Sequence, residues 1–200
     1  MIKLLIVEDQ ALVRDAISTL LHLDPEIDVV AQAEDGDDAL RILQQKTVDL
    51  VLTDIEMPNM TGLELMEVVK QRFPEIKIAI MTTFSRVGYI RRALEGGVDG
   101  FILKEAPSDY LVAAIKNIMQ GQKVIDPELA ISALGDRDPL SDKERKALRF
   151  AGEGLKTSDI AAKLFLSEGT VRNYLSEAIS KLNATNRIDA ARIAHQKGWL

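Results

Sequence analysis

Apolar and polar residues alternate in blocks along the first 120 residues. Five short apolar runs, rich in β-branched side chains, are typical of strands that are covered on both faces; they read KLLIV, DVVAQA, VDLVLTD, IKIAIMT and DGFILK. Between these runs lie segments of helical length, at 11–23, 37–46, 62–73, 87–96 and 107–120. Five strand–helix units in succession predict an α/β domain with a five-stranded, parallel, doubly wound sheet and right-handed crossovers.

The alternation ends at Gly121, a residue that can close the preceding helix. The run DPE at 126–128 has the order of an N-cap, a proline at the first helical position and a first-turn acid. We therefore predict a linker over 121–138 that contains one short helix ending at Leu134. A disordered tether is the alternative.

From Leu140 onwards the apolar spacing is helical only. Each helix start is marked by residues that can cap it: Ser141 in a capping box with Glu144, Thr157 or Ser158, Ser167, and Asn186. The second and third helices are joined by a tight turn, which is the helix-turn-helix arrangement. We predict a small all-α, four-helix domain over 139–200, after an α/β domain over 1–120.

Charge separates the two halves further. Residues 137–200 carry 12 Lys and Arg against 8 Asp and Glu, a net of +4, whereas the preceding residues carry 13 against 23, a net of −10. A change of sign along a chain suggests two units with different partners. The basic half could meet nucleic acid, and composition drift is the alternative.

Composition also excludes several classes of protein. The chain has no cysteine, which excludes thiol catalysis, disulfides and thiolate metal sites. No apolar run approaches the length of a membrane span. The first residues lack the basic start, apolar core and cleavage site of a signal peptide, so we expect a cytoplasmic protein without a membrane partner.

Polar side chains follow four predicted strands at the point where each strand ends. They are Glu8 with Asp9, Asp54, Thr82 and Lys104. Because ligands of parallel sheets bind beyond the carboxyl ends of the strands, we expect these groups at one edge. Clustered carboxylates favour a hard cation, and Mg²⁺ is the natural candidate. A carboxylate beside Mg²⁺, with a hydroxyl and a lysine nearby, can attack a phosphoryl group.

Four motifs carry a resemblance to a known family: VED at 7–9, TDIEMPNMTG at 53–62, MTT at 81–83 and FILK at 101–104. Together they make residues 1–120 resemble the receiver domain of bacterial two-component response regulators, whose fold is flavodoxin-like. The resemblance implies that a sensor histidine kinase phosphorylates Asp54. It also implies that Asp54 shares a Mg²⁺ site with Glu8, Asp9 and the backbone carbonyl of Glu56.

The same resemblance assigns the remaining strand-end residues. It implies that Thr82 and Phe101 form a switch pair and that Lys104 contacts the phosphoryl group. Phe101 stands where the family often has tyrosine, so this side chain has no hydroxyl to donate when it turns inward.

The third predicted helix of the second half is amphipathic. Its polar face carries Arg172, Asn173 and Ser176, and arginine and asparagine suit guanine and adenine in the major groove. Lys163 and Lys181 are better read as possible phosphate contacts. An ordinary solvated helix face is the alternative.

A second resemblance covers residues 139–200. The stretches PLSDKERKAL, GLKTSDIAAKLFLSEGTVRNYLSEAISKL and NRIDAARIA resemble the DNA-binding domain of the NarL/LuxR class of transcription factors. The runs TVRNY and KGW are most similar to regulators of membrane-lipid desaturase genes in Gram-positive bacteria. The resemblance implies a regulator, not an enzyme, that forms a homodimer on phosphorylation and binds promoter DNA.

Two other functions compete with this interpretation. A phosphohydrolase of similar fold would turn over at Asp54 with Glu56 as general acid, but it would leave the second domain unexplained. An atypical regulator would never be phosphorylated, but its acidic set would be broken. Surfaces for pairing are predicted on the receiver around Val13, Ile17, Ala114 and Ile118, and on the last helix around Ile188, Ala190, Ala191, Ile193 and Ala194; burial in the core is the alternative for both.

Overall fold

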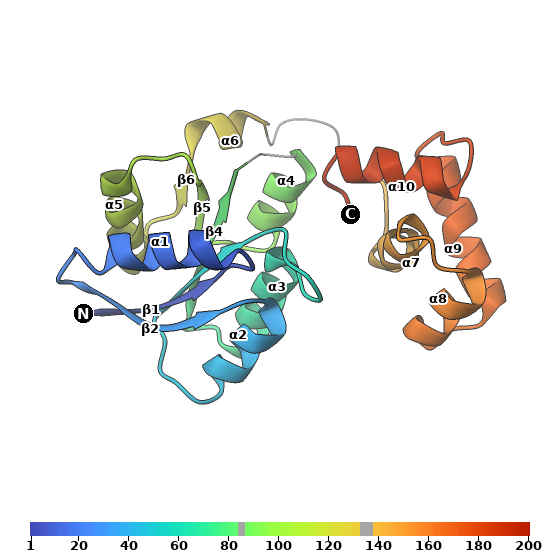
Figure 1. Cartoon of the computed structure of the whole chain (residues 1–200). Helices are drawn as coiled ribbons and strands as arrows, with labels where there is room; N and C mark the ends of the chain where they lie inside the picture. The colour runs from blue at the N-terminus through green and yellow to red at the C-terminus, as the bar shows by residue number, and fades with distance from the viewer. Residues whose placement is uncertain (84–86, 133–137) are drawn as a thin grey trace. The chain divides into compact units, whose positions relative to one another are not determined.

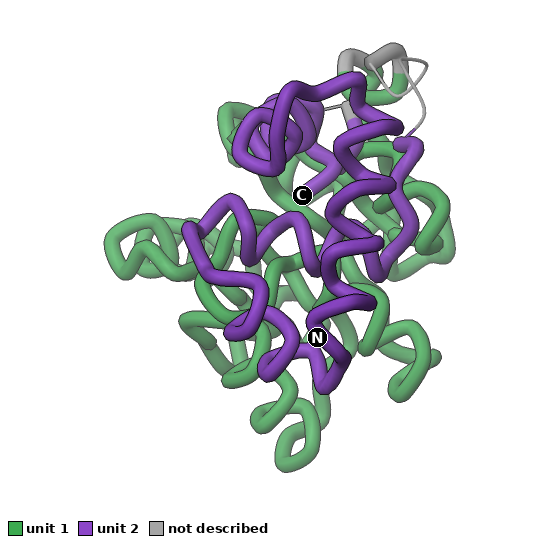
Figure 2. The backbone as a smooth tube through the Cα atoms, turned by 90° about the vertical axis from the view of Figure 1, so that its right-hand side faces the viewer, with its two compact units in different colours: residues 1–85, 90–133 green, residues 86–89, 134–200 purple. Residues whose placement is uncertain are grey.

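The computed structural model describes residues 1–83, 87–132 and 138–200. It divides into two compact units (Figure 2), of which the first comprises residues 1–85 and 90–133 and the second residues 86–89 and 134–200. Each unit has its own core of buried apolar side chains.

The first unit is built on a parallel sheet with the strand order β2-β1-β3-β4-β5-β6 (Figure 1). The strands are β1 (Ile2–Val7), β2 (Ile27–Ala33), β3 (Leu50–Asp54), β4 (Lys77–Thr82), β5 (Gly100–Leu103) and β6 (Val124–Ile125). The first five confirm the predicted parallel α/β fold. The sixth was not predicted: β6 pairs Val124 with Gly100 and Ile125 with Phe101, and a strand of two residues is too short to show a periodic pattern.

The helices that follow these strands along the chain alternate with them as predicted. They are α1 (Ala11–Leu21), α2 (Gly36–Leu43), α3 (Gly62–Arg72), α4 (Val87–Glu95), α5 (Ser108–Met119) and α6 (Pro127–Ser132). Helices α1 and α5 cover one face of the sheet, against alternate residues such as Leu4, Leu52 and Ile102. Helices α2 and α3 lie on the other face (Figure 1). The strands are apolar along both faces because both faces are covered.

Helix α5 ends at a glycine, as the sequence predicts. Gly121 has φ +86 and donates to the carbonyl of Ile118 at 2.9 Å, and Gln122 donates to the carbonyl of Asn117 at 3.1 Å. These two bonds form a Schellman motif, in which glycine accepts a left-handed backbone without strain. The predicted end of α6, at Leu134, lies outside the described residues.

The second unit contains four helices in its C-terminal part: α7 (Asp142–Gly152), α8 (Thr157–Leu164), α9 (Glu168–Lys181) and α10 (Arg187–Gln196). The predicted capping box of Ser141 and Glu144 and the caps at Ser167 and Asn186 are confirmed. The cap of α8 was predicted wrongly, because Lys156 occupies the N-cap position without a side-chain bond. Within the described ranges, no helix combines the length and the apolar character that a membrane crossing requires.

Candidate functional site

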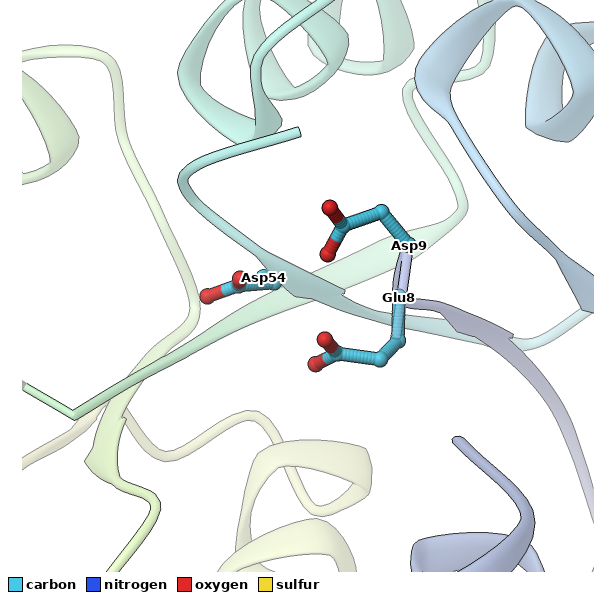
Figure 3. A group of neighbouring side chains, drawn as sticks. All are labelled: Glu8, Asp9 and Asp54. Carbon is cyan, nitrogen blue, oxygen red and sulfur yellow. The ribbon is translucent and has the colours of Figure 1, made fainter. Parts of the chain in front are cut away.

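The carboxyl ends of β1 and β3 bring three acids together (Figure 3). Glu8 and Asp9 follow β1, and Asp54 is the last residue of β3. One carboxylate oxygen from each residue lies within 4.8 Å of the others. Glu8 and Asp54 are buried, at 1% and 8% exposure, whereas Asp9 is exposed. The sheet thus gathers three side chains that the sequence placed at one edge.

Lys104 supplies the countercharge. Its Nζ atom lies 2.6 Å from a carboxylate oxygen of Glu8 and 3.2 Å from one of Asp54. Its backbone N–H donates to the carbonyl of Thr82 at 2.8 Å, which fixes where the side chain departs from the sheet. Burial lowers the pKa of the Lys104 ammonium, but the two carboxylates more than offset this, and the net pKa is raised.

The negative charge of the Asp54 carboxylate is only partly compensated by its surroundings. Burial raises its pKa to about 6; the Lys104 charge works against this rise and the Glu8 charge adds to it. A carboxylate in this setting gains from any further cation, because a nearby positive charge favours its ionised form. The site therefore attracts a cation to the acids that Lys104 only partly neutralises.

The backbone on either side of Asp54 is closely constrained. A Cβ atom on Gly62 would lie 1.8 Å from the carbonyl oxygen of Asp54, so only glycine fits there. Gly62 also donates to the carbonyl of Ile55 at 2.9 Å, and the hydroxyl of Thr53 donates to the Asp54 carbonyl at 2.9 Å. The loop that follows Asp54, with the exposed residue Glu56 in it, is thus folded back onto the strand end.

A side-chain bond that the sequence did not predict anchors the same loop. Asn59, in a left-handed conformation at φ +63, donates from Nδ2 to Asp35 at 2.8 Å. The other carboxylate oxygen of Asp35 caps α2 by accepting from the N–H of Asp38 at 2.8 Å. The only local signal was an asparagine after Pro58, because asparagine tolerates the left-handed region. Its partner lies on another loop.

Arg14 is a second residue that the sequence analysis missed. From α1 its guanidinium donates to the backbone carbonyl of Glu8 at 2.5 Å. This bond holds the turn that presents Glu8 and Asp9. The separation of six residues, from a strand end to the first turn of a helix, gives no recognisable motif.

The two residues assigned to the switch occupy neighbouring strands. Thr82 ends β4 and is 6% exposed, and Phe101 lies in β5, in register with Ile80. The ring of Phe101 is fully buried, so this side chain points into the core.

In the second unit, α9 separates an apolar from a polar face as predicted. Val171, Leu175 and Ala178 are buried, whereas Arg172, Asn173 and Ser176 are exposed. Within the described part of the chain, the Arg172 guanidinium forms an ion pair with Glu168 at 3.4 Å, and both side chains are more than half exposed. The polar face of α9 is therefore accessible to a partner.

The two lysines predicted to contact phosphate differ in their surroundings. Lys163 is exposed, and its Nζ lies 5.4 Å from the centroid of the Phe150 ring. Lys181 instead donates to both carboxylate oxygens of Glu144, at 2.9 and 2.8 Å. A DNA phosphate would have to compete with Glu144 for the Lys181 ammonium.

The residues predicted to form pairing surfaces are only partly exposed. Ala114, Ile118, Ala190, Ala191 and Ala194 are buried in the cores of their units. Val13 and Ile17 are partly buried and line a small cavity with Leu111. Ile188 is 52% exposed. For the buried alanines and Ile118, core packing explains the apolar character.

Two family models together cover nearly the whole chain. The model described as "Response regulator receiver domain" matches residues 4–116, and that described as "Bacterial regulatory proteins, luxR family" matches residues 138–194. The chain belongs to the response regulators. It is a two-component response regulator with a LuxR-type DNA-binding domain and acts as a transcription regulator, in a family that is not enzymatic. The phosphohydrolase alternative is therefore set aside.

Two relatives that match the chain over its full length are transcriptional regulatory proteins by name. The chain is 42% identical over 200 residues to the uncharacterized transcriptional regulatory protein YvfU of Bacillus subtilis, covering 100% of both chains. It is 40% identical over 199 residues to the transcriptional regulatory protein DesR of the same organism, covering 100% of this chain and 99% of that one. The two identities are nearly equal, and both relatives match the chain over its full length.

Solved structures show the same arrangement of elements. The response regulator ChrA of a heme-sensing two-component system is 31% identical, with a TM-score of 0.57 over 100% of this chain and 98% of that one. RcsB from Salmonella enterica serovar Typhimurium, bound to promoter rprA in the presence of the phosphomimetic beryllofluoride, is 25% identical, with a TM-score of 0.72 over 96% and 97%.

Proposed function

We propose that Asp54 accepts a phosphoryl group from a sensor histidine kinase with the help of Mg²⁺, and that the phosphorylated chain binds promoter DNA as a homodimer. The observation that carries the proposal is the position of the Lys104 ammonium, within 3.2 Å of both Glu8 and Asp54. A buried carboxylate beside a lysine, at the open end of a parallel sheet, has the surroundings that a phosphoryl acceptor needs.

The donor set fits Mg²⁺. Glu8, Asp9 and Asp54 offer carboxylate oxygens close to one another, and Glu56 would add a backbone carbonyl. Oxygen ligands of this kind are what Mg²⁺ takes in proteins. The bound ion would supply positive charge for the phosphoryl oxygens.

The chain's own residues account for the remaining chemistry. A carboxylate oxygen of Asp54 attacks phosphorus; the new P–O bond forms as the P–N bond of a phosphohistidine breaks, and its electron pair stays on the leaving imidazole. The Lys104 ammonium turns from the Asp54 carboxylate to a phosphoryl oxygen. The Thr82 hydroxyl donates a hydrogen bond to another phosphoryl oxygen.

Phosphorylation adds negative charge and three acceptor oxygens at the strand end. Attraction of Thr82 towards these oxygens would change the packing beside Phe101, whose ring is already buried. A local charge change of this kind can bias a two-state element on the receiver surface and favour pairing. Val13 and Ile17 on the receiver and Ile188 on α10 remain the candidates for contact between copies.

Each predicted domain is proposed to have its own role. Residues 1–120 receive the phosphoryl group, 121–138 link, and 139–200 bind DNA. Arg172, Asn173 and Ser176 would read base edges, and Lys163 would contact phosphate, because all four are exposed. The Lys181 ammonium would serve first as the partner of Glu144 and only second as a phosphate contact.

Intact-mass measurement after treatment with acetyl phosphate and Mg²⁺ tests the acceptor. We expect one added phosphoryl group on the wild type and on Asp37→Ala, an exposed aspartate that serves as the matched control, and none on Asp54→Ala. Labelling of Asp54→Ala, or full labelling in excess chelator, would overturn the proposal. Absence of labelling on the wild type would favour a regulator that works without phosphorylation.

A further inference from the structure

Phe165 occupies an unusual backbone position. It lies in the turn between α8 and α9 and has φ 55 and ψ 44, in the left-handed region. Its own N–H donates to the carbonyl of Ala162 at 3.4 Å, and the N–H of Leu166 donates to that of Ala161 at 2.9 Å, which closes α8. A bulky side chain is rarely found in this conformation, where glycine or asparagine is less strained.

Other helix ends in the same chain follow the ordinary choice. Helix α5 is followed by Gly121 at φ +86 and α9 by Asn183 at φ +49. Among the ends of α5, α8 and α9, only that of α8 has an aromatic residue in the left-handed conformation. The choice of phenylalanine is therefore unfavourable for the turn itself.

The Phe165 side chain is also exposed to water. It is 95% exposed, whereas its neighbours Leu164 and Leu166 are partly buried and pack against the core of the second unit. An aromatic ring that stays in contact with water contributes no hydrophobic stabilisation to the fold. Strain and exposure at one residue together point to a function and not to a role in stability.

The position of the turn indicates what covers the ring. Phe165 stands two residues before Ser167, the N-cap of α9, and α9 carries the exposed Arg172 and Asn173. In helix-turn-helix proteins the first residues of the recognition helix contact base edges, so the turn before them lies beside the wall of the major groove. That wall offers apolar atoms, namely the deoxyribose carbons and the methyl group of thymine.

We propose that Phe165 is a DNA contact, whose ring packs against deoxyribose or a thymine methyl at the edge of the major groove. This inference rests on the proposed binding of DNA through α9. The contact adds apolar burial to the hydrogen bonds of Arg172 and Asn173, and it involves no charge.

The test uses the full-length chain with beryllofluoride and a DNA duplex that carries the sequence to which the chain binds specifically. Phe165→Gly and Phe165→Asn remove the ring and relieve the left-handed strain. We expect both variants to be at least as thermally stable as the wild type and to bind about tenfold more weakly, as expected for loss of a partly buried ring. The dependence of affinity on salt should stay the same, because no charge is removed.

Asn183→Gly is the matched control, because it changes the left-handed residue at the other end of α9 and should leave affinity unchanged. If Phe165→Gly binds as the wild type does while Arg172→Ala loses the site, Phe165 is not a DNA contact and the proposed function stands. If Arg172→Ala and Asn173→Ala also bind unchanged, α9 does not read the DNA and the proposed function fails at that step. Loss of self-association by Phe165→Gly without DNA would instead assign the ring to a second copy of the chain and overturn the inference.

Discussion

The ammonium group of Lys181, at the end of α9, bonds to both carboxylate oxygens of Glu144, in the first turn of α7. Glu144 also accepts the N–H of Ser141 at 2.8 Å as part of the capping box. Burial raises the pKa of Glu144, but the bonds from Lys181 and Ser141 outweigh it and lower the net pKa. One buried carboxylate thus ties the helix proposed to read DNA to the start of the first helix of the domain.

Replacement of Lys181 separates this role from a phosphate contact. We expect Lys181→Ala to lower the stability of the second unit by about 1–3 kcal/mol, because Glu144 is left with one partner fewer in a buried site. Lys181→Arg should restore most of the loss. Thermal melts give the stability, and DNA affinity at several salt concentrations gives the salt slope. Unchanged melting with a salt slope reduced by about 0.9 would identify Lys181 as a phosphate contact instead.

The raised pKa of Asp54 makes the first unit sensitive to pH. A carboxyl whose pKa is about 6 in the folded chain, against an ordinary value of 3.8, binds its proton more tightly when folded. The stability it contributes is present below about pH 4 and is lost as the pH rises through about 6.

Asp54→Asn removes the charge, so we expect it to stabilise the first unit by roughly 2–3 kcal/mol at pH 7.5 in chelator. The gain should shrink towards zero at pH 4. Calorimetry of the full chain at both values measures it, and Asp9→Asn, at the exposed acid of the same cluster, is the control. An equal gain at both values would show that burial of the Asp54 charge is not its cause.

The hydrogen bond between Asn59 and Asp35 can be tested by exchanging the amide and the carboxylate between the two positions. Asp35→Asn keeps a capping oxygen for α2, and Asn59→Asp keeps a residue that tolerates φ +63. We expect Asn59→Asp alone to slow phosphorylation of Asp54 by acetyl phosphate, because two carboxylates then face each other and the loop after Asp54 is displaced.

The double variant, Asp35→Asn with Asn59→Asp, should recover the rate, because the amide and the carboxylate have only exchanged places and one can again donate to the other. Labelling rates of the wild type, both single variants and the double variant complete the cycle. If the double variant is as slow as the product of the two single variants, the bond does not position the loop.

The sequence allowed the acidic site to be predicted because one rule, the meeting of parallel strand ends at one edge, fixes where Glu8, Asp54 and Lys104 lie. The first five strands were predicted from their own apolar runs, each of several residues and rich in β-branched side chains. Strand β6 was missed because Val124 and Ile125 are too few to form a pattern.

Local sequence patterns do not predict contacts between residues that are far apart in the chain. The sequence predicts a capping box at Glu144 and a possible phosphate contact at Lys181, but no local signal joins residues that are 37 positions apart. Phe165 reads as an ordinary apolar residue within LFLS, because its left-handed backbone and its exposure depend on how the turn closes.

Binding to a duplex that carries two half-sites, compared before and after phosphorylation, shows whether the phosphoryl group on Asp54 controls the affinity for DNA. The affinity of the wild type should rise at least about tenfold on phosphorylation, because pairing makes the second contact intramolecular. Asp54→Ala should bind weakly under both conditions, and a duplex with one half-site should gain little. Equal affinity of the wild type with and without the phosphoryl group on Asp54, or the same rise for Asp54→Ala, would show that phosphorylation of Asp54 does not control DNA binding.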